Sequence, residues 1–332
     1  MKISLDGGAL CGSGRFGNYF FSENLIKALS IYDKKNDYWI YSFCQRPPWL
    51  DRNLVYQDLR PKKLWMNFRV ALEENLFPKD VFLALNQSLP FFFRSKKIIS
   101  FSHGLSFHFY PKYYPDSVNK MAKQLEDIVG RSDKIVVSSK KVEKEIANIF
   151  PKLNKIEVIP FGVPFDMLVN SSCQKKDYFL FVGMNHPIKN IEFLVKVFKK
   201  FISDKKYRHF KLRLVGDYSD YADNKNVFSL GNLDRINLKR QYSQATAYLT
   251  ASYYESFNLP VLEALSCGTQ VVGMASAIIP EFDPYVLSAK DEEQFVSNMS
   301  KTVEERTVSE AKKIKEKFSW KKYVESLLKL YD

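Results

Sequence analysis

Two glutamates, Glu255 and Glu263, are spaced so that they can flank one small site. Residues 247–251 form a short apolar run typical of a strand, and Asn258 can cap a helix that follows. Glu255 is therefore expected in the loop and Glu263 inside the helix. A helix N-terminus presents N–H groups and a positive dipole end, which bind anions such as a diphosphate. Because a carboxylate repels phosphate, both glutamates are expected to bind sugar or ribose hydroxyls, unless they are solvated surface acids.

The same stretch carries signals for both ends of the helix. Pro260 can occupy the first turn, and Gly268 can end the helix in a left-handed conformation. Residues 270–272 predict the next strand, so the stretch is one strand–loop–helix–strand unit. Strand and helix patterns alternate along much of the remaining chain, which predicts an α/β fold with the loop of this unit at the carboxyl end of a sheet.

Length and composition set the broad class. The chain has 332 residues, 45% hydrophobic and 26% charged, which suits two globular α/β domains better than one. No apolar run is long enough to span a bilayer, and the N-terminal residues lack the apolar core of a signal peptide. The cysteines Cys11, Cys44, Cys173 and Cys267 lack metal-ligand spacing, so we expect reduced thiols in a cytoplasmic protein.

The net charge is +13, and most of it falls in the first half of the chain. This imbalance indicates an anionic partner, such as a membrane surface, a lipid diphosphate or nucleic acid, unless it is only a solvated lysine-rich surface. Residues 89–97 join aromatic to basic side chains. That segment fits either a shallow membrane contact or a buried strand end.

A glycine-rich loop, residues 12–17, follows a first strand predicted over residues 2–6. Its Gly-x-Gly-x-x-Gly pattern is found in dinucleotide sites, which also need an acid at the end of the second strand. The predicted second strand, residues 38–42, ends without one. An NAD-dependent oxidoreductase using this loop therefore remains only an alternative.

Residues 255–263 read Glu-Ser-Phe-Asn-Leu-Pro-Val-Leu-Glu, and Ala-Leu-Ser-Cys-Gly follows at residues 264–268. This pattern resembles the family 4 retaining glycosyltransferases of the GT-B fold. The resemblance implies two doubly wound Rossmann-like domains that face each other across a cleft. It places an acceptor-side domain at residues 1–165, a nucleotide-sugar-binding domain at 166–310, and a C-terminal helix at 311–332 that crosses back to the first domain.

The resemblance also implies roles for residues of the helix unit. Glu255 would hold the hydroxyls of the transferred sugar, and Glu263 would hold the ribose. The backbone N–H groups of Phe257, Asn258 and Leu259 would bind sugar and phosphates.

Further site residues implied by the resemblance lie outside that unit. Lys189, in the run Pro-Ile-Lys-Asn, matches the phosphate-binding lysine of the family. His103, after a strand predicted over residues 98–102, would touch the donor sugar, and Gly17 would face the cleft. Many relatives have arginine where this chain has Met184. Donor binding is therefore expected to rely on Lys189 with backbone dipoles, or on a basic residue that the pattern does not identify.

The chain contains no Asp-x-Asp motif, which agrees with a metal-independent enzyme without a cofactor. Transfer with retention is implied, from a nucleotide diphosphate sugar to a glycan or lipid-linked acceptor. The runs FVGMNHPIKN and IIPEF resemble bacterial mannosyl- and rhamnosyltransferases of surface polysaccharides, which favours GDP-mannose as donor. We expect a cytoplasmic protein with peripheral contact to an anionic membrane and no nucleic-acid partner. The other alternative is a binding protein that kept the fold and lost activity, which Met184 favours.

Overall fold

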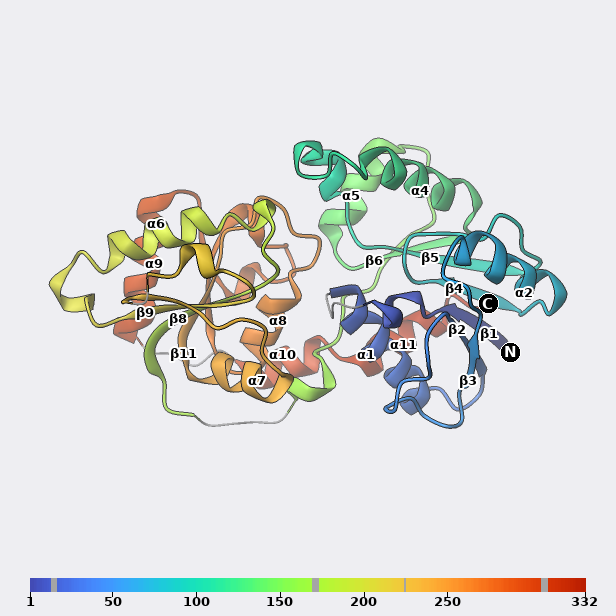
Figure 1. Ribbon diagram of the computed structural model, residues 1–332, viewed down its shortest axis with the longest axis horizontal. Helices are drawn as coiled ribbons and strands as arrows, with labels where there is room; N and C mark the ends of the chain where they lie inside the picture. Colours follow the sequence, from blue (N-terminus) through green and yellow to red (C-terminus); the bar gives the residue numbers. More distant parts are fainter. Residues whose placement is uncertain (13–16, 169–172, 224, 306–309) are drawn as a thin grey trace. The chain divides into compact units, whose positions relative to one another are not determined.

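The computed structural model describes residues 1–12, 17–168, 173–223, 225–305 and 310–332. The chain forms two compact units: Met1–Gly162 together with Ser319–Asp332, and Val163–Phe318 (Figure 1). The sequence-based boundaries were residues 165 and 310. Helix α10, Ala311–Lys317, packs on α8, Leu259–Ser266, and so belongs to the second unit rather than to the returning segment. No helix in the described ranges is long and apolar enough to cross a membrane.

The first unit is built on a seven-stranded sheet with the order β3-β2-β1-β4-β5-β6-β7. Every neighbouring pair is parallel. The strands are β1 Lys2–Asp6, β2 Asp37–Ser42, β3 Val55–Asp58, β4 Val81–Ala84, β5 Lys97–Ser102, β6 Lys134–Val137 and β7 Ile156–Val158. Most strand residues are buried, as expected for a parallel sheet covered on both faces.

Helices cover both faces of this sheet. One face packs on η2, α4 and α5, whose apolar side chains share a core with alternate residues of β4, β5 and β6. The helical segments are η1 Gly8–Cys11, α1 Gly17–Tyr32, η2 Trp65–Val70, α2 Ala71–Leu76, α3 Ser106–Phe109, η3 Pro111–Tyr113, α4 Val118–Arg131, α5 Lys140–Ile149 and α11 Trp320–Leu328. Helix α1 begins at Gly17, the last residue of the glycine-rich pattern at residues 12–17.

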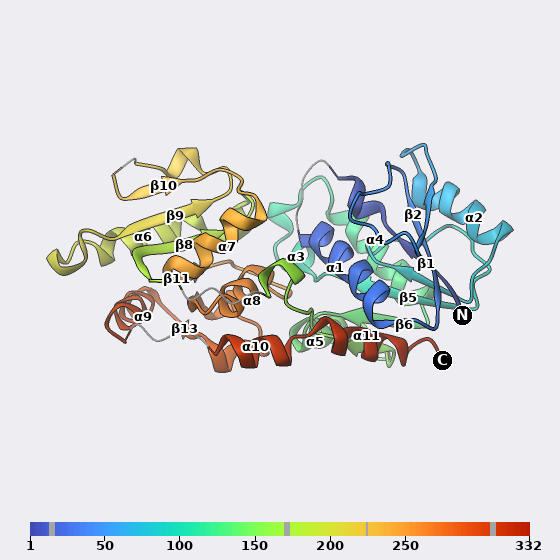
Figure 2. The same ribbon diagram turned by 90° about the horizontal axis from the view of Figure 1, so that it is seen from below.

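The C-terminal helix α11 packs beside α1, at the opposite end of the sequence (Figures 1 and 2). Phe21 of α1 lies at the centre of this contact, with its ring centroid 6.3 Å from that of Trp320 and 6.2 Å from that of Tyr323. It also packs on Phe161, at 4.7 Å, just before the chain leaves the first unit. Buried aromatic contacts with α1 therefore hold the chain both where it leaves the first unit and where it returns to it.

The second unit has a six-stranded sheet with the order β10-β9-β8-β11-β12-β13. All of its neighbouring pairs are parallel. The strands are β8 Lys176–Val182, β9 Lys211–Val215, β10 Val227–Ser229, β11 Ala245–Thr250, β12 Gln270–Met274 and β13 Leu287–Ala289.

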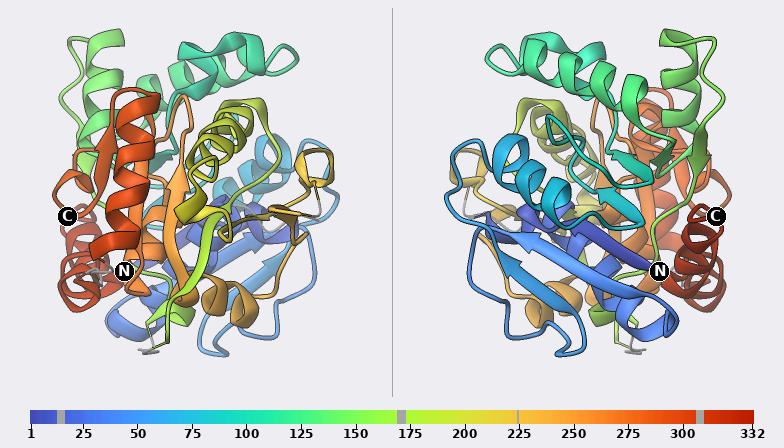
Figure 3. Two further views of the ribbon diagram at one scale, coloured as in Figure 1. Left: turned by 90° about the vertical axis from the view of Figure 1, so that its left-hand side faces the viewer. Right: turned by 90° about the vertical axis from the view of Figure 1, so that its right-hand side faces the viewer.

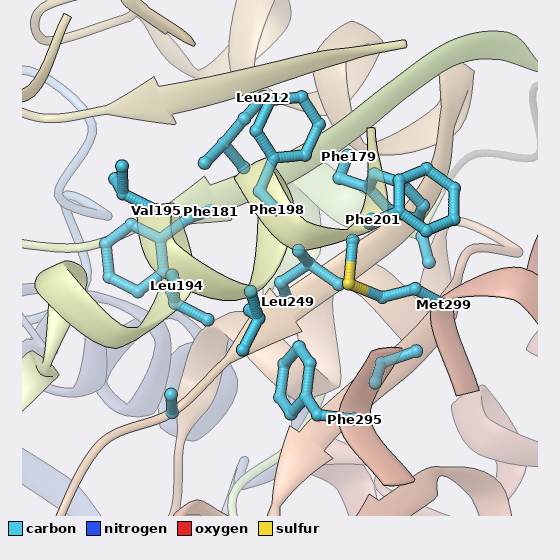
Figure 4. Close-up of a cluster of buried hydrophobic side chains, with 14 of the residues drawn as sticks. Phe179, Phe181, Leu194, Val195, Phe198, Phe201, Leu212, Leu249, Phe295 and Met299 are labelled. Carbon is cyan, nitrogen blue, oxygen red and sulfur yellow. The ribbon is translucent and has the colours of Figure 1, made fainter. Parts of the chain in front are cut away.

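Two layers of helices also enclose the second sheet. On one face, α6 Ile191–Phe201 and α9 Glu292–Glu305 lie side by side (Figure 3, left). Their apolar side chains pack on alternate sheet residues such as Phe179, Leu212 and Leu249 (Figure 4). On the other face, α7 Arg235–Gln244 packs on β8 and β11, and α8 packs on β12.

Both sheets are doubly wound, as predicted. The strand order reverses between β1 and β4 in the first sheet and between β8 and β11 in the second. Loops from neighbouring strands diverge at such switch points, outside the carboxyl ends of the strands, and leave room for a ligand. The cleft between domains stays a prediction.

One expectation about the cysteines is wrong. Cys11 and Cys44 form a disulfide across 33 positions of sequence, with their Cα atoms 5.4 Å apart, whereas Cys173 and Cys267 are free. Cys11 ends η1 after β1, and Cys44 follows β2. Because β1 and β2 are parallel neighbours, their carboxyl ends meet at one edge, which a reading of sequence spacing alone does not reveal.

We predict that Phe21→Ala destabilises the first unit by about 3–5 kcal/mol, because it removes a fully buried aromatic ring. The four tryptophans all lie in the first unit, so their fluorescence during urea unfolding reports that unit alone. Ile31→Ala, on the exposed end of the same helix, is the matched control and should change the free energy of unfolding by less than about 0.5 kcal/mol. Equal midpoints for both variants would contradict this role of Phe21.

Candidate active site

The segment from β11 to β12 folds as the predicted strand–loop–helix–strand unit. Helix α8 starts at Leu259, has Pro260 in its first turn, and is followed by Gly268 in the left-handed conformation. Asn258 stands at the N-cap position, yet it does not cap the helix through its side chain. Its φ is 65°, and its amide donates to the Ala277 carbonyl at 3.0 Å. Asn258 therefore braces the loop against the segment after β12.

Glu255 and Lys189 form an ion pair at the switch point of the second sheet. Lys189 Nζ lies 2.7 Å from Glu255 Oε1, and the Ser252 hydroxyl donates to the same oxygen at 2.7 Å. The side chains of Lys189 and Glu255 are 21% and 12% exposed, so the pair is largely screened from water. Lys189 follows β8 and Glu255 follows β11, the two strands between which the order reverses. Two predicted site residues 66 positions apart are thus brought into direct contact.

The loop that carries Lys189 is held by neighbouring strands. Tyr218, after β9, donates its hydroxyl to the Met184 carbonyl at 2.6 Å. Gly216 has a φ of 130°, and a Cβ there would lie 2.2 Å from the Gly183 carbonyl oxygen, so only glycine fits. Lys189 ends the short helix η5, Pro187–Lys189. Asn190 stands at the N-cap of α6 with a φ of 53° and makes no side-chain cap.

Glu263 belongs to a second charged cluster. Its Oε1 accepts a hydrogen bond from Arg235 Nη2 at 2.7 Å, and its Oε2 accepts from the Tyr242 hydroxyl at 2.9 Å. Arg235 also makes a two-point contact with Asp166, at 2.6 and 2.9 Å. The Glu263 side chain is only 4% exposed, so Arg235 provides the positive charge that a buried carboxylate requires.

Electrostatics within this cluster favour the ionised pair. Burial alone would lower the pKa of the Arg235 guanidinium, but the charges of Glu263 and Asp166 outweigh burial and raise it. Burial and the nearby Glu263 charge raise the pKa of Tyr242 well above its usual value. Tyr242 therefore stays protonated and donates to Glu263.

Phe257 and Leu259 stand at the start of α8, as predicted for two of the backbone groups that would meet phosphate. The Phe257 side chain is 2% exposed and packs edge-on against Phe282, with ring centroids 5.2 Å apart. This packing anchors the loop between Glu255 and α8. Pro260 has no backbone N–H, so an anion at this end of α8 would accept hydrogen bonds from the backbone N–H groups of the preceding residues.

His103 lies at the carboxyl end of β5 in the first unit, where the sequence places it. Its Nε2 is 2.6 Å from the Leu85 carbonyl oxygen, which can only accept, so Nε2 carries the hydrogen. Burial lowers the pKa of the imidazole more than this hydrogen bond raises it. The ring is therefore neutral at pH 7, with Nδ1 as its acceptor nitrogen.

The glycine-rich loop is described only at its ends. Residues 13–16 lie outside the described residues. Gly17 is exposed and begins α1, and a Cβ there would meet no atom within 4 Å. Nothing in the packing around Gly17 thus demands glycine.

Three residues of the charged clusters were missed by the sequence analysis: Asp166, Arg235 and Tyr242. Arg235 is the first residue of α7, Tyr242 lies about two turns further along it, and Asp166 lies in η4, Phe165–Met167. None of them belongs to the glutamate motif in sequence. Only a pattern that linked Arg235 to Glu263 across 28 positions would have found the pair.

Comparison with known proteins agrees with this geometry. Residues 176–305 match the sequence family described as Glycosyl transferases group 1. The O-antigen chain mannosyltransferase B of Escherichia coli is 26% identical over 213 residues, which cover 57% of this chain and 55% of that protein. The O-antigen chain mannosyltransferase RfbU of Salmonella typhimurium is 32% identical over 177 residues, covering 49% and 48%. The chain thus spans about half to three-fifths of the length of the curated relatives it matches.

Solved structures resemble the whole chain. Sucrose-phosphate synthase from Thermosynechococcus elongatus superimposes with a TM-score of 0.74 at 16% identity, covering 100% of this chain and 98% of that one. WaaG, a glycosyltransferase involved in lipopolysaccharide biosynthesis, has a TM-score of 0.69 at 13% identity, covering 97% and 93%. At these identities the likeness shows the fold alone, which is the GT-B fold with its two Rossmann-like domains.

We predict that Arg235→Ala lowers the free energy of unfolding of the second unit by about 3 kcal/mol, because it leaves the buried Glu263 carboxylate without its cation. The second unit has no tryptophan, so the change should appear in urea unfolding followed by circular dichroism and not in tryptophan fluorescence. Arg240→Ala, at an exposed position on the same helix, is the control and should have little effect. An equal loss in both variants would show that the cluster does not stabilise the unit.

Proposed function

We propose that this protein, whose residues 176–305 form a glycosyl transferases group 1 domain, transfers a hexose from a nucleotide diphosphate sugar to a glycan or lipid-linked glycan. The observation that carries the proposal is the Lys189–Glu255 pair at the switch point of that domain. Glu255 lies just before the start of α8, so a cation, a carboxylate and a helix N-terminus belong to one group of loops. A diphosphate leaving group and a sugar ring need these groups.

The reaction we propose breaks the bond between the sugar C1 and the oxygen of the β-phosphate, whose electron pair stays on the diphosphate. An acceptor hydroxyl forms the new bond to C1 from the same face, with retention of configuration, and its proton passes to the leaving phosphate. Lys189 and the backbone N–H groups at the start of α8 neutralise the departing charge without a metal ion. Glu255 holds sugar hydroxyls and stabilises the positive charge that develops on the ring.

An incoming diphosphate competes with Glu255 for Lys189. The phosphates carry more negative charge than one carboxylate, so Lys189 would turn toward them and release the Glu255 oxygen that it now occupies. Glu255 would then be available to the sugar hydroxyls. The ion pair thus holds both side chains in place until the donor arrives.

Glu263 is proposed to bind the ribose. Each of its oxygens already accepts one hydrogen bond, from Arg235 and from Tyr242, so a ribose hydroxyl must share an oxygen or displace Arg235. His103 of the first unit is proposed to touch the donor sugar through Nδ1, because its Nε2 is engaged by Leu85.

GDP-mannose is the donor we favour, because two relatives are named as O-antigen chain mannosyltransferases. The acceptor would then be a growing surface glycan, and the reaction would take place in the cytoplasm. Release of GDP from GDP-mannose in the presence of acceptor tests this proposal. A protein that binds GDP without turnover of any nucleotide sugar would instead be a binding protein of the same fold.

We predict that Lys189→Ala weakens GDP binding by about tenfold or more but leaves guanosine binding nearly unchanged, because the ammonium group meets only phosphate. Isothermal titration with the two ligands measures both effects. Lys196→Ala is the matched control, since Lys196 is an exposed lysine of α6, a few residues further along the chain. The assignment fails if Lys189→Ala weakens GDP and guanosine binding to the same degree.

We predict different kinetic losses for the two glutamates. Glu255→Gln should lower kcat by about tenfold or more, because its carboxylate interacts most strongly with the charged transition state. Glu263→Gln should mainly raise KM for the donor, since a hydrogen bond to a charged acceptor contributes about 1.5–3 kcal/mol. Steady-state kinetics with varied donor measure both, and thermal unfolding checks that each variant is folded at the assay temperature. Normal turnover by Glu255→Gln, or a kcat loss confined to Glu263→Gln, would reverse the assignment.

A further inference from the structure

Large apolar side chains gather on the outer side of the first unit, on η2, α2 and the loop after β4. We call this set the apolar patch: Phe68, Leu72, Leu76, Phe77, Phe91 and Phe92. Each is at least 42% exposed, and Phe77 reaches 61%. Single exposed apolar residues are ordinary, whereas a continuous group of them marks a contact surface.

The helical part of the apolar patch is a stripe with four-residue spacing. Phe68, Leu72 and Leu76 are exposed, while Val70 and Ala71 between them are buried, and Val70 belongs to the core shared with the sheet. Figure 3 (right) shows α2, in light blue, on the side of the first unit turned toward the viewer. A surface helix usually has a polar outer face, whereas the exposed residues of α2 are Leu72 and Leu76, with Glu73 and Asn75 half-buried between them. Packing within the first unit explains the buried apolar residues of η2 and α2, but it does not explain the exposed ones.

The loop after β4 completes the apolar patch and is held in place. The Phe91 N–H donates to the Asn67 carbonyl at 3.4 Å, and the rings of Phe68 and Phe91 meet edge-on at 5.2 Å. From α4, Arg131 Nη2 donates to the Pro90 carbonyl at 2.6 Å. These contacts fix the backbone that presents Phe91 and Phe92 outward, so an incoming surface meets an ordered site.

The surroundings of the apolar patch are basic. Arg94 and Lys96 follow Phe92 in the same loop, and Lys62 and Lys63 precede η2, and all four are exposed. Lys96 pairs with Asp80 at 2.8 Å, which offsets part of this charge. The acid on the inner side of α2, Glu74, is buried and accepts hydrogen bonds from Tyr41 and Ser95. The exposed border therefore carries more positive than negative charge.

We infer that the apolar patch is a docking surface for an anionic membrane, with its aromatic and leucine side chains in the headgroup region and its basic border against lipid phosphates. Apolar side chains ringed by Lys and Arg are the combination that binds such interfaces. A second copy of this chain fits less well, because a symmetric dimer would bring the basic border against itself. The inference does not depend on the proposed transferase activity.

Sedimentation of the full-length chain with vesicles tests this inference. The vesicles are phosphatidylcholine alone, or an equimolar mixture of phosphatidylcholine and phosphatidylglycerol, each at low and high salt. The first variant is Phe91→Ser with Phe92→Ser, and the second is Arg94→Glu. Ile236→Ser is the matched control, because Ile236 is an 83% exposed apolar residue of the second unit. Tryptophan fluorescence during unfolding shows whether the first unit remains folded in each variant.

We expect the unchanged protein to bind the anionic vesicles and to bind the neutral ones weakly, with salt reducing the difference because it screens exposed charges. The double serine variant should lose about tenfold or more of its anionic-vesicle binding, the Arg94→Glu variant several-fold, and the control none. Equal binding to both vesicle types, or full binding by a folded double serine variant, would overturn the inference. So would a dimer in analytical ultracentrifugation that the double serine variant abolishes, because the surface would then belong to a second copy.

Discussion

The candidate site depends on the parallel pairing of β8 with β11, two strands that are neighbours in the sheet and far apart in the chain. Their carboxyl ends open at one place, with Lys189 after the first strand and Glu255 after the second. The pairing register decides how far each loop reaches beyond the sheet, and a shift by one residue would also exchange the side chains that pack on its two helix-covered faces. Neighbouring strands then add Tyr218 and Gly216, which fix the Lys189 loop. The Lys189–Glu255 ion pair thus depends on which strands are neighbours in the sheet more than on the local sequence around either residue.

The charged side chains of the candidate site in the second unit form two groups, an outer layer and an inner layer, which differ in exposure to water. The outer layer is the Lys189–Glu255 pair, which retains some contact with water and can exchange partners. The inner layer joins Asp166, Arg235 and Glu263, with Glu263 almost fully buried. An inner cation with two carboxylate partners is costly to remove, so α7, α8 and η4 are held to one another at the edge of the site. The outer pair can therefore exchange a partner for a bound ligand, whereas the inner cluster holds α7, α8 and η4 in place.

Local patterns in the sequence predicted β1, β2, β5, β11, α8 and β12, because each of these elements carries its own periodicity or end signals. The resemblance to a known family implied the two doubly wound sheets, and the pattern of residues 247–268 placed Glu255 in a loop and Glu263 in a helix. Local patterns failed where long-range contacts override residue type. Asn258 was expected to cap α8, but it adopts a left-handed conformation and does not cap the helix through its side chain. The Arg235–Glu263 pair and the Cys11–Cys44 bond arise from strand order and helix packing, which no single segment encodes.

The chain leaves the first unit after Gly162 and returns at Ser319, and the two crossings lie together, since the Val163 N–H donates to the Phe318 carbonyl at 2.9 Å. The second unit is therefore one uninterrupted insertion whose ends meet. The first unit is discontinuous, since α11 follows the inserted unit in the chain and packs on Phe21 of α1. During synthesis the inserted unit can finish folding before α11 has been made, while the apolar face of α1 stays uncovered. Chaperone binding to the nascent protein should thus concentrate on α1, and a ribosome that stalls before α11 would leave one finished unit and one open core.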